Sequence, residues 1–118
     1  MDLEYREVTD YPEGGGLYEG TWLGDKIEGL GVLVYRDGSI YEGTFENGVP
    51  QGTGRRITND DLEIYTGDFV NGARHGKGCV RTHEGVIADC EWQNSMKHGY
   101  GNERWADGAS YTGHYIAG

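Results

Sequence analysis

Residues 18 to 22 alternate strictly between two kinds of side chain. Side chains in a β-strand point alternately to its two faces, so Tyr18, Gly20 and Trp22 share one face of an extended segment. Glu19 and Thr21 share the other face. This alternation predicts a strand with one aromatic face and one polar face.

The same five-residue pattern recurs along the chain at nearly constant spacing. Its copies begin at residues 18, 41, 65, 88 and 111, so successive spacings are 23, 24, 23 and 23 residues. The copy at 88 is degenerate, because Ala88 and Cys90 replace the tyrosine and the glycine while Trp92 keeps the aromatic. A fixed period of this length indicates a repeat protein. The other copies are Tyr18-Glu-Gly-Thr-Trp22, Tyr41-Glu-Gly-Thr-Phe45, Tyr65-Thr-Gly-Asp-Phe69 and Tyr111-Thr-Gly-His-Tyr115.

A second strand is predicted within each repeat. Seven residues after each closing aromatic comes a Gly-x-Gly, and an acidic residue with glycine, such as Asp37-Gly38, usually precedes the next tyrosine. Glycine lets a neighbouring ring lie flat on the backbone, which predicts a structural role for the repeated glycines. These glycines are Gly20, Gly29, Gly31, Gly43, Gly52, Gly54, Gly67, Gly76, Gly78, Gly99, Gly101 and Gly113.

Hairpins therefore connect the strands both within and between repeats. We expect an Asp-Gly-Ser loop between Arg36 and Ile40 to form a type I turn with a glycine bulge, which keeps Tyr35 and Tyr41 on one face. In the second strand of the first repeat, Leu30, Val32 and Val34 fall on the opposite face from Leu33. The predicted fold is all-β: an elongated, single-layer, twisted antiparallel meander of about ten strands, solenoid-like and without significant helix.

These motifs resemble the MORN-repeat family (membrane occupation and recognition nexus), and the resemblance covers residues 11 to 118. The predicted organisation is one continuous domain. It comprises an N-terminal half-repeat or cap at 1–17, repeats at 18–40, 41–64, 65–87 and 88–110 (degenerate), and the start of a fifth at 111–118. Because the last motif opens a repeat, we expect the chain to be a fragment of a longer repeat protein.

Composition favours an aromatic core over an aliphatic one. The chain has 22 glycines, nine tyrosines, three tryptophans and two phenylalanines among 118 residues. The predicted aromatic face would line a groove that binds a partner. Its residues are Tyr18, Trp22, Tyr35, Tyr41, Phe45, Tyr65, Phe69, Trp92, Trp105, Tyr111 and Tyr115.

The charge balance argues against several partners. A formal net charge of -10 repels nucleic acid and disfavours anionic membranes. No apolar run is long enough for a transmembrane helix, and residues 1–4 lack the features of a signal peptide. We expect a cytoplasmic protein associated with the cytoskeleton or a cilium, as the resemblance implies.

Candidate chemistry is weak throughout the sequence. His75 and His98 share a repeat position about 9 to 10 Å apart, too far for one metal ion. Cys79 and Cys90 fall on opposite faces, which argues against a disulfide. No helix follows the glycine motifs to cradle a phosphate. We predict no catalytic, cofactor or metal residues, and therefore no enzyme.

Three functions fit this sequence. The favoured one is a non-catalytic scaffold that binds a helix or extended peptide of a cytoskeletal, ciliary or organelle-junction partner in the aromatic groove. The second is a peripheral phosphoinositide-recognition module, or the targeting segment of a larger enzyme such as a lipid kinase, as the resemblance implies. The third is self-assembly, including a homodimer through unpaired edge strands near Tyr5 and Tyr115.

Overall fold

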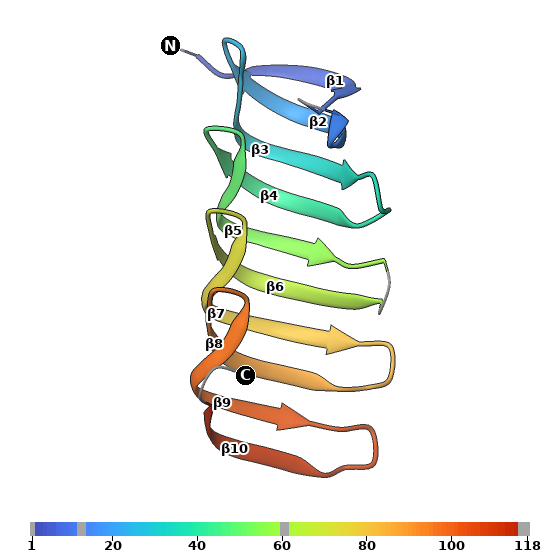
Figure 1. Cartoon of the computed structure of the whole chain (residues 1–118), viewed down its shortest axis with the longest axis vertical. Coiled ribbons are helices and arrows are strands. Elements are labelled where there is room, and N and C mark those ends of the chain that lie inside the picture. Colours follow the sequence, from blue (N-terminus) through green and yellow to red (C-terminus); the bar gives the residue numbers. More distant parts are fainter. Residues whose placement is uncertain (1, 12–13, 60–61, 116–118) are drawn as a thin grey trace.

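The computed structural model describes residues 2–11, 14–59 and 62–115 and places their strands in one antiparallel sheet. Each strand pairs with its neighbours in sequence, so the order in the sheet is the order in the chain (Figure 1). The predicted all-β meander is confirmed, and the described residues contain no α-helix. The ten strands are β1 (Glu4–Asp10), β2 (Gly16–Leu23), β3 (Lys26–Tyr35), β4 (Ile40–Glu46), β5 (Val49–Ile57), β6 (Glu63–Val70), β7 (Ala73–Thr82), β8 (Ile87–Gln93), β9 (Met96–Arg104) and β10 (Ser110–Tyr115).

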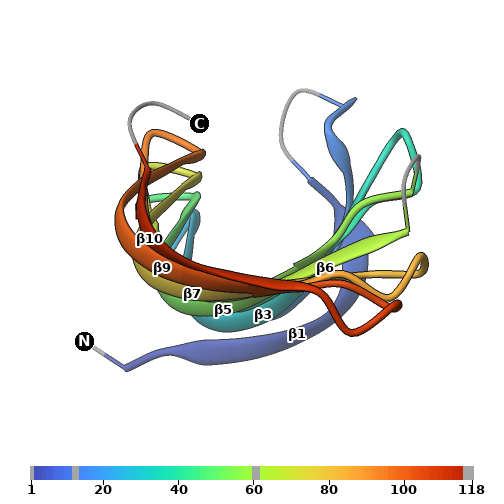
Figure 2. The same ribbon diagram turned by 90° about the horizontal axis from the view of Figure 1, so that it is seen from below.

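The sheet is long and strongly curved. Its extents are 48 × 25 × 20 Å, and Figure 2, viewed along the stack of strands, shows an open trough. A register shift occurs at the same place in each repeat, next to the closing aromatic, as between Gly43 and Phe45. Such β-bulges bend the strand that carries them. The sheet therefore curves into a trough because each repeat bends at the same position.

Two kinds of turn connect the strands. Within repeats, β4 and β5 are joined at Asn47-Gly48, where both φ angles are positive, as a type I′ turn requires. Between repeats, Gly38 has φ 93° and its N–H donates to the Tyr35 carbonyl at 3.0 Å. The predicted type I turn with a glycine bulge is confirmed. The loop begins one residue earlier than predicted, because Ser39 already pairs with Tyr35.

The repeat tyrosines form the centre of the core. Tyr18, Tyr41 and Tyr65 are each 0% exposed, and the hydroxyl of each donates to the carbonyl three residues later, at 2.8 to 3.0 Å. A Cβ on Gly54 would collide with the ring of Tyr41, and Gly31 and Gly78 have the same relation to Tyr18 and Tyr65. The second glycine of each of these Gly-x-Gly motifs therefore leaves room, by having no side chain, for the ring of a tyrosine.

The first glycine of each Gly-x-Gly has a different role. Gly29, Gly52, Gly76 and Gly99 have φ angles of 85°, 88°, 74° and 75°, in the left-handed region that side chains disfavour. Each lies at the bulge of its hairpin. The two glycines of the motif are thus required for separate reasons, backbone conformation and ring clearance.

A continuous chain of edge-to-face ring contacts joins the repeats. Tyr41 of β4 contacts Phe45 at 5.1 Å and Phe69 of β6 at 4.9 Å between centroids, although β5 lies between them. Edge-to-face geometry at such distances is the favoured arrangement of aromatic pairs. The chain runs in the order Trp22, Tyr18, Phe45, Tyr41, Phe69, Tyr65 and Trp92.

The face opposite the rings, here called the outer face, is not polar throughout. Leu30, Val32 and Val34 lie on it as the sequence predicts, and they are 66%, 38% and 37% exposed. Leu17 pairs with Val34 on the same face. The outer face of β2 carries the predicted Glu19 and Thr21 beside Leu17, whereas the outer face of β3 is apolar at Leu30, Val32 and Val34. The ring-bearing face is called the inner face below.

The buried tyrosines make the fold sensitive to alkali. Burial raises the pKa of Tyr18, Tyr41 and Tyr65 to about 12, whereas an exposed tyrosine ionises near 10. The folded state therefore holds these protons more tightly than the unfolded state. Their contribution to stability is complete below pH about 10 and is lost as the pH rises to about 12.

We expect the free energy of unfolding to fall between these pH values by up to about 1.4 kcal/mol per pH unit for each of these tyrosines. Urea titrations at several pH values, with tyrosinate absorbance as a second signal, measure this slope. The same slope in a Tyr111→Phe variant is the expected control, since Tyr111 is exposed. A flat stability profile from pH 10 to 12 would contradict burial of the three hydroxyls.

Candidate functional site

The structure places the eleven aromatic residues of the predicted binding face in two groups. Seven are at most 7% exposed and belong to the core. A partner cannot reach the faces of these rings without displacing them, so their role in the folded chain is packing. They are Tyr18, Trp22, Tyr41, Phe45, Tyr65, Phe69 and Trp92.

The other four rings remain accessible on the inner face. Trp105 and Tyr111 are 38% and 43% exposed, and Tyr35 and Tyr115 are partly buried against the core. Three of the four belong to the C-terminal end, where Tyr111 and Tyr115 contact each other at 5.4 Å. Accessible aromatic surface is thus concentrated at β9 and β10.

Four cations lie over rings of the inner face. Arg6 covers Trp22 at 4.8 Å, and Arg56 covers Tyr35 at 4.6 Å from the ring centroid. Arg74 lies 5.0 Å from the Tyr65 centroid and 5.1 Å from that of Trp92. Contacts of this kind contribute about 0.5 to 1 kcal/mol at exposed sites, as for Arg6, whose side chain is 41% exposed, and about 2 kcal/mol when desolvated.

The fourth cation, Lys97, lies 5.5 Å from the ring centroid of Tyr115. It forms an ion pair with Glu103, which is only 8% exposed. Tyr115 donates to the same carboxylate at 2.9 Å. Burial, followed by this hydrogen bond, raises the pKa of Tyr115. The Lys97 ammonium compensates the buried carboxylate of Glu103.

Sequence reasoning missed these cations because they are scattered in the chain. For Arg74 and Lys97 a usable signal was the position in the repeat that pairs with the closing aromatic, which is held in turn by Ile27, Pro50, Arg74 and Lys97. In the first two repeats this position is apolar, and in the last two it is cationic. The C-terminal half of the trough therefore combines accessible rings with charged side chains.

The other sequence candidates form no reactive site. Cys79 and Cys90 are free, and burial raises the pKa of Cys90, which keeps it a thiol. His75 and His98 border the same shallow surface depression with Glu91. Within 2–11, 14–59 and 62–115 no three or more His, Cys, Asp or Glu side chains are grouped to hold a metal ion. The described residues also include no helix long and apolar enough to cross a membrane.

Fold and site together define a class: a tandem β-hairpin repeat protein whose single curved sheet offers an inner face of rings and cations. Comparison with known families agrees, since the MORN repeat family matches residues 18–40, 41–61, 65–81 and 91–110. The chain belongs to the MORN repeat family. The match omits residues 82–90, which include Ala88 and Cys90.

Curated relatives share the repeat region. The chain is 39% identical to alsin of Rattus norvegicus and 36% identical to alsin of Homo sapiens, each over 88 residues and 71% of the chain. It is 28% identical to the ALS2 C-terminal-like protein of Homo sapiens over 107 residues. These alignments span 5% of each alsin and 11% of the third protein, so the chain matches only a small part of each.

Proposed function

We propose that this chain is a non-catalytic scaffold that binds a helix or an extended peptide of a partner protein along the inner face of its sheet. The observation that carries the proposal is that the inner face keeps accessible rings outside the buried core. Trp105 and Tyr111 are 38% and 43% exposed on that face, and Tyr35 and Tyr115 are partly buried. Tryptophan and tyrosine are the commonest anchors of protein interfaces.

The curved sheet supports this proposal by its geometry. Repeat arrays offer extended concave surfaces that accommodate an elongated segment, and the sheet of this chain curves into a trough (Figure 2). Arg74 and Lys97 lie over rings of this face and are ion-paired with Glu63 and Glu103. We place the protein in a cytoskeletal, ciliary or organelle-junction assembly, in keeping with the family it resembles.

Trp105→Ala combined with Tyr111→Ala is expected to abolish partner capture without unfolding the sheet. Truncation of an aromatic anchor costs about 2 kcal/mol or more, so the double variant should weaken binding at least about thirtyfold. The measurement is quantitative affinity purification from cell lysate, followed by titration of the recovered partner. Cross-linking through Lys97 then identifies the partner segment in the trough.

The matched control is Leu30→Ala with Tyr100→Ala, which removes two exposed apolar side chains from the outer face. This control should bind the partner as the native chain does. Equal losses in both double variants would contradict recognition by the inner face.

Phosphoinositide recognition is the second candidate, and the four cations of the inner face favour it. They are spread over β1, β5, β7 and β9, and Arg74 and Lys97 are ion-paired with Glu63 and Glu103. Co-sedimentation with phosphoinositide vesicles at physiological salt, lost on neutralising Arg56 and Arg74, would rank this candidate first.

A further inference from the structure

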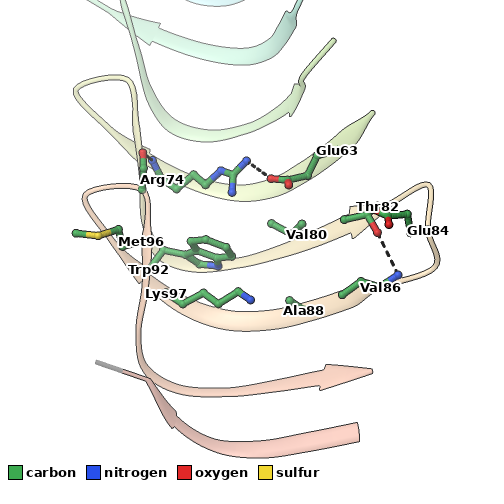
Figure 3. A pocket seen from close by; sticks show the side chains of 11 residues that line it. Glu63, Arg74, Val80, Thr82, Glu84, Val86, Ala88, Trp92, Met96 and Lys97 are labelled. Carbon is green, nitrogen blue, oxygen red and sulfur yellow. Dashed lines mark hydrogen bonds and ion pairs between the residues drawn. The ribbon is translucent and has the colours of Figure 1, made fainter. Parts of the chain in front are cut away.

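A cavity opens on the inner face of the degenerate repeat. It is separate from Trp105 and Tyr111, which do not line it. It encloses about 340 Å³ and is floored by Val80 and Ala88, which pair across β7 and β8. Trp92, Met96, Arg74 and Lys97 also line it (Figure 3). Pockets of roughly 300 Å³ and above are large enough for a small ligand or an inserted side chain.

The cavity exists because Ala88 stands where three other repeats have a buried tyrosine. Tyr41 contacts the closing aromatic of its own repeat and that of the next, and Tyr18 and Tyr65 do likewise. Ala88 can make neither contact. The chain of ring contacts therefore stops at Trp92.

Only part of the vacated space is filled from within the chain. The Sγ atom of Cys90 and the ring of Tyr115 lie where a Cβ on Gly101 would be. In the preceding repeats the tyrosine hydroxyl occupies that place, next to Gly54 or Gly78. The hollow that remains lies above Ala88 and Val80, toward Thr82 and Val86.

The charges that line the cavity cancel. Its lining has two cations, Arg74 and Lys97, and two acids, Glu63 and Glu84. Arg74 pairs with Glu63 at 2.6 Å, and both side chains are at most 25% exposed. An anionic headgroup would find no net attraction here, whereas an uncharged ring would meet apolar side chains and one edge of Trp92.

We propose that this cavity is the anchor site for one aromatic side chain of the partner segment bound in the trough. The inserted ring would lie over Ala88 and Val80, in the space that the missing repeat tyrosine leaves unfilled, contact Trp92, and lie beside the guanidinium of Arg74. This assignment rests on the proposed function and adds to it the kind of residue that the partner must present. It predicts a partner segment whose aromatic residue docks between β7 and β9.

The direct test uses p-cresol, the side chain of tyrosine, as the probe and needs no partner. Titration of the native chain is followed by NMR at the Trp92 indole N–H and the methyl groups of Ala88 and Met96. We expect saturable shifts at these groups with a Kd of about 1 to 10 mM, as befits a fragment of this size. The double substitution Ala88→Tyr, Cys90→Gly restores the side chains of the other repeats and should abolish the shifts at Trp92 and Met96.

Two further variants make the test decisive. Asp89→Tyr adds the same ring to the outer face of β8, where Asp89 is exposed, and should leave the shifts unchanged. If the double variant fails to fold, Val80→Leu takes its place. Leucine is the residue at the equivalent position of the first repeat, Leu33; at position 80 it narrows the cavity and should weaken the shifts.

The proposal is overturned if p-cresol gives no saturable shift in the native chain, or the same shifts after the cavity is filled. It is also overturned if inorganic phosphate saturates the site and p-cresol does not, which would indicate an anion site. Either failure leaves the Trp105 and Tyr111 experiment unaffected, so the anchor site and the scaffold function are tested separately.

Discussion

Gly54→Ala is expected to lower the free energy of unfolding by about 3 kcal/mol, although it adds a single methyl group in the middle of a strand. The added Cβ would overlap the hydroxyl end of the Tyr41 ring. Overpacking a tight core costs about 1 to 3 kcal/mol, and a displaced ring would also lose its hydrogen bond to Thr44, worth about 1 kcal/mol. Urea denaturation followed by circular dichroism measures the loss, and the melting temperature should fall by roughly 10 to 20 °C.

The control for this prediction is Gly108→Ala. Gly108 has φ 93° with open space around it, so alanine there meets backbone strain but no steric overlap. We expect a cost of about 1 to 2 kcal/mol. If Gly54→Ala were no more damaging than this control, the Tyr41 ring would not be held against the glycine as the structure shows.

Tyr65→Ala should destabilise the protein still more, by about 4 to 5 kcal/mol. The substitution removes a fully buried ring that contacts Phe69 and Trp92 and lies beneath the Arg74 guanidinium. Large-to-small replacements of buried aromatic residues cost about 3 to 5 kcal/mol because they leave a cavity in the core. The measurement is again urea denaturation, with Trp92 fluorescence as a local probe.

Tyr65→Phe separates the contribution of the ring to stability from that of its hydroxyl. It keeps the ring contacts and loses only the hydrogen bond to the Asp68 carbonyl, so a loss of about 1 kcal/mol is expected. The native chain already has alanine at the equivalent position 88, where Cys90 occupies part of the space. Equal losses for Tyr65→Ala and Tyr65→Phe would mean that ring packing does not connect the repeats.

Much of the fold was readable from the sequence because it depends on local periodicity. The alternation in residues 18–22 assigns Tyr18 and Trp22 to one face, and the turn at Gly38 fixes the next strand on the same face. Each strand pairs only with its neighbours in sequence, so no pairing between distant strands had to be predicted. The error of one residue at the loop after Tyr35 arose because the hydrogen bond from Tyr35 to Ser39 has no distinct sequence signal.

The candidate site was less predictable. The sequence places eleven rings on one face but does not say which are covered, since burial depends on how sharply the sheet bends. The bulges between Gly43 and Phe45, and their equivalents, bring rings from alternate strands into contact. This curvature buries Tyr41 under Phe69 of the next repeat, whereas Tyr111 lies on β10, the last described strand, and is exposed.

The sequence by itself determined the repeat, its period, the strand faces and the need for glycine beneath the tyrosines, because these follow from spacing along one chain. The tertiary structure alone decided which rings remain accessible, where Arg74 and Lys97 lie, and that the Ala88 position is a hollow. The physical reason is that these properties depend on distances between side chains from different strands. Those distances are set by the accumulated bend of the sheet, to which every repeat contributes.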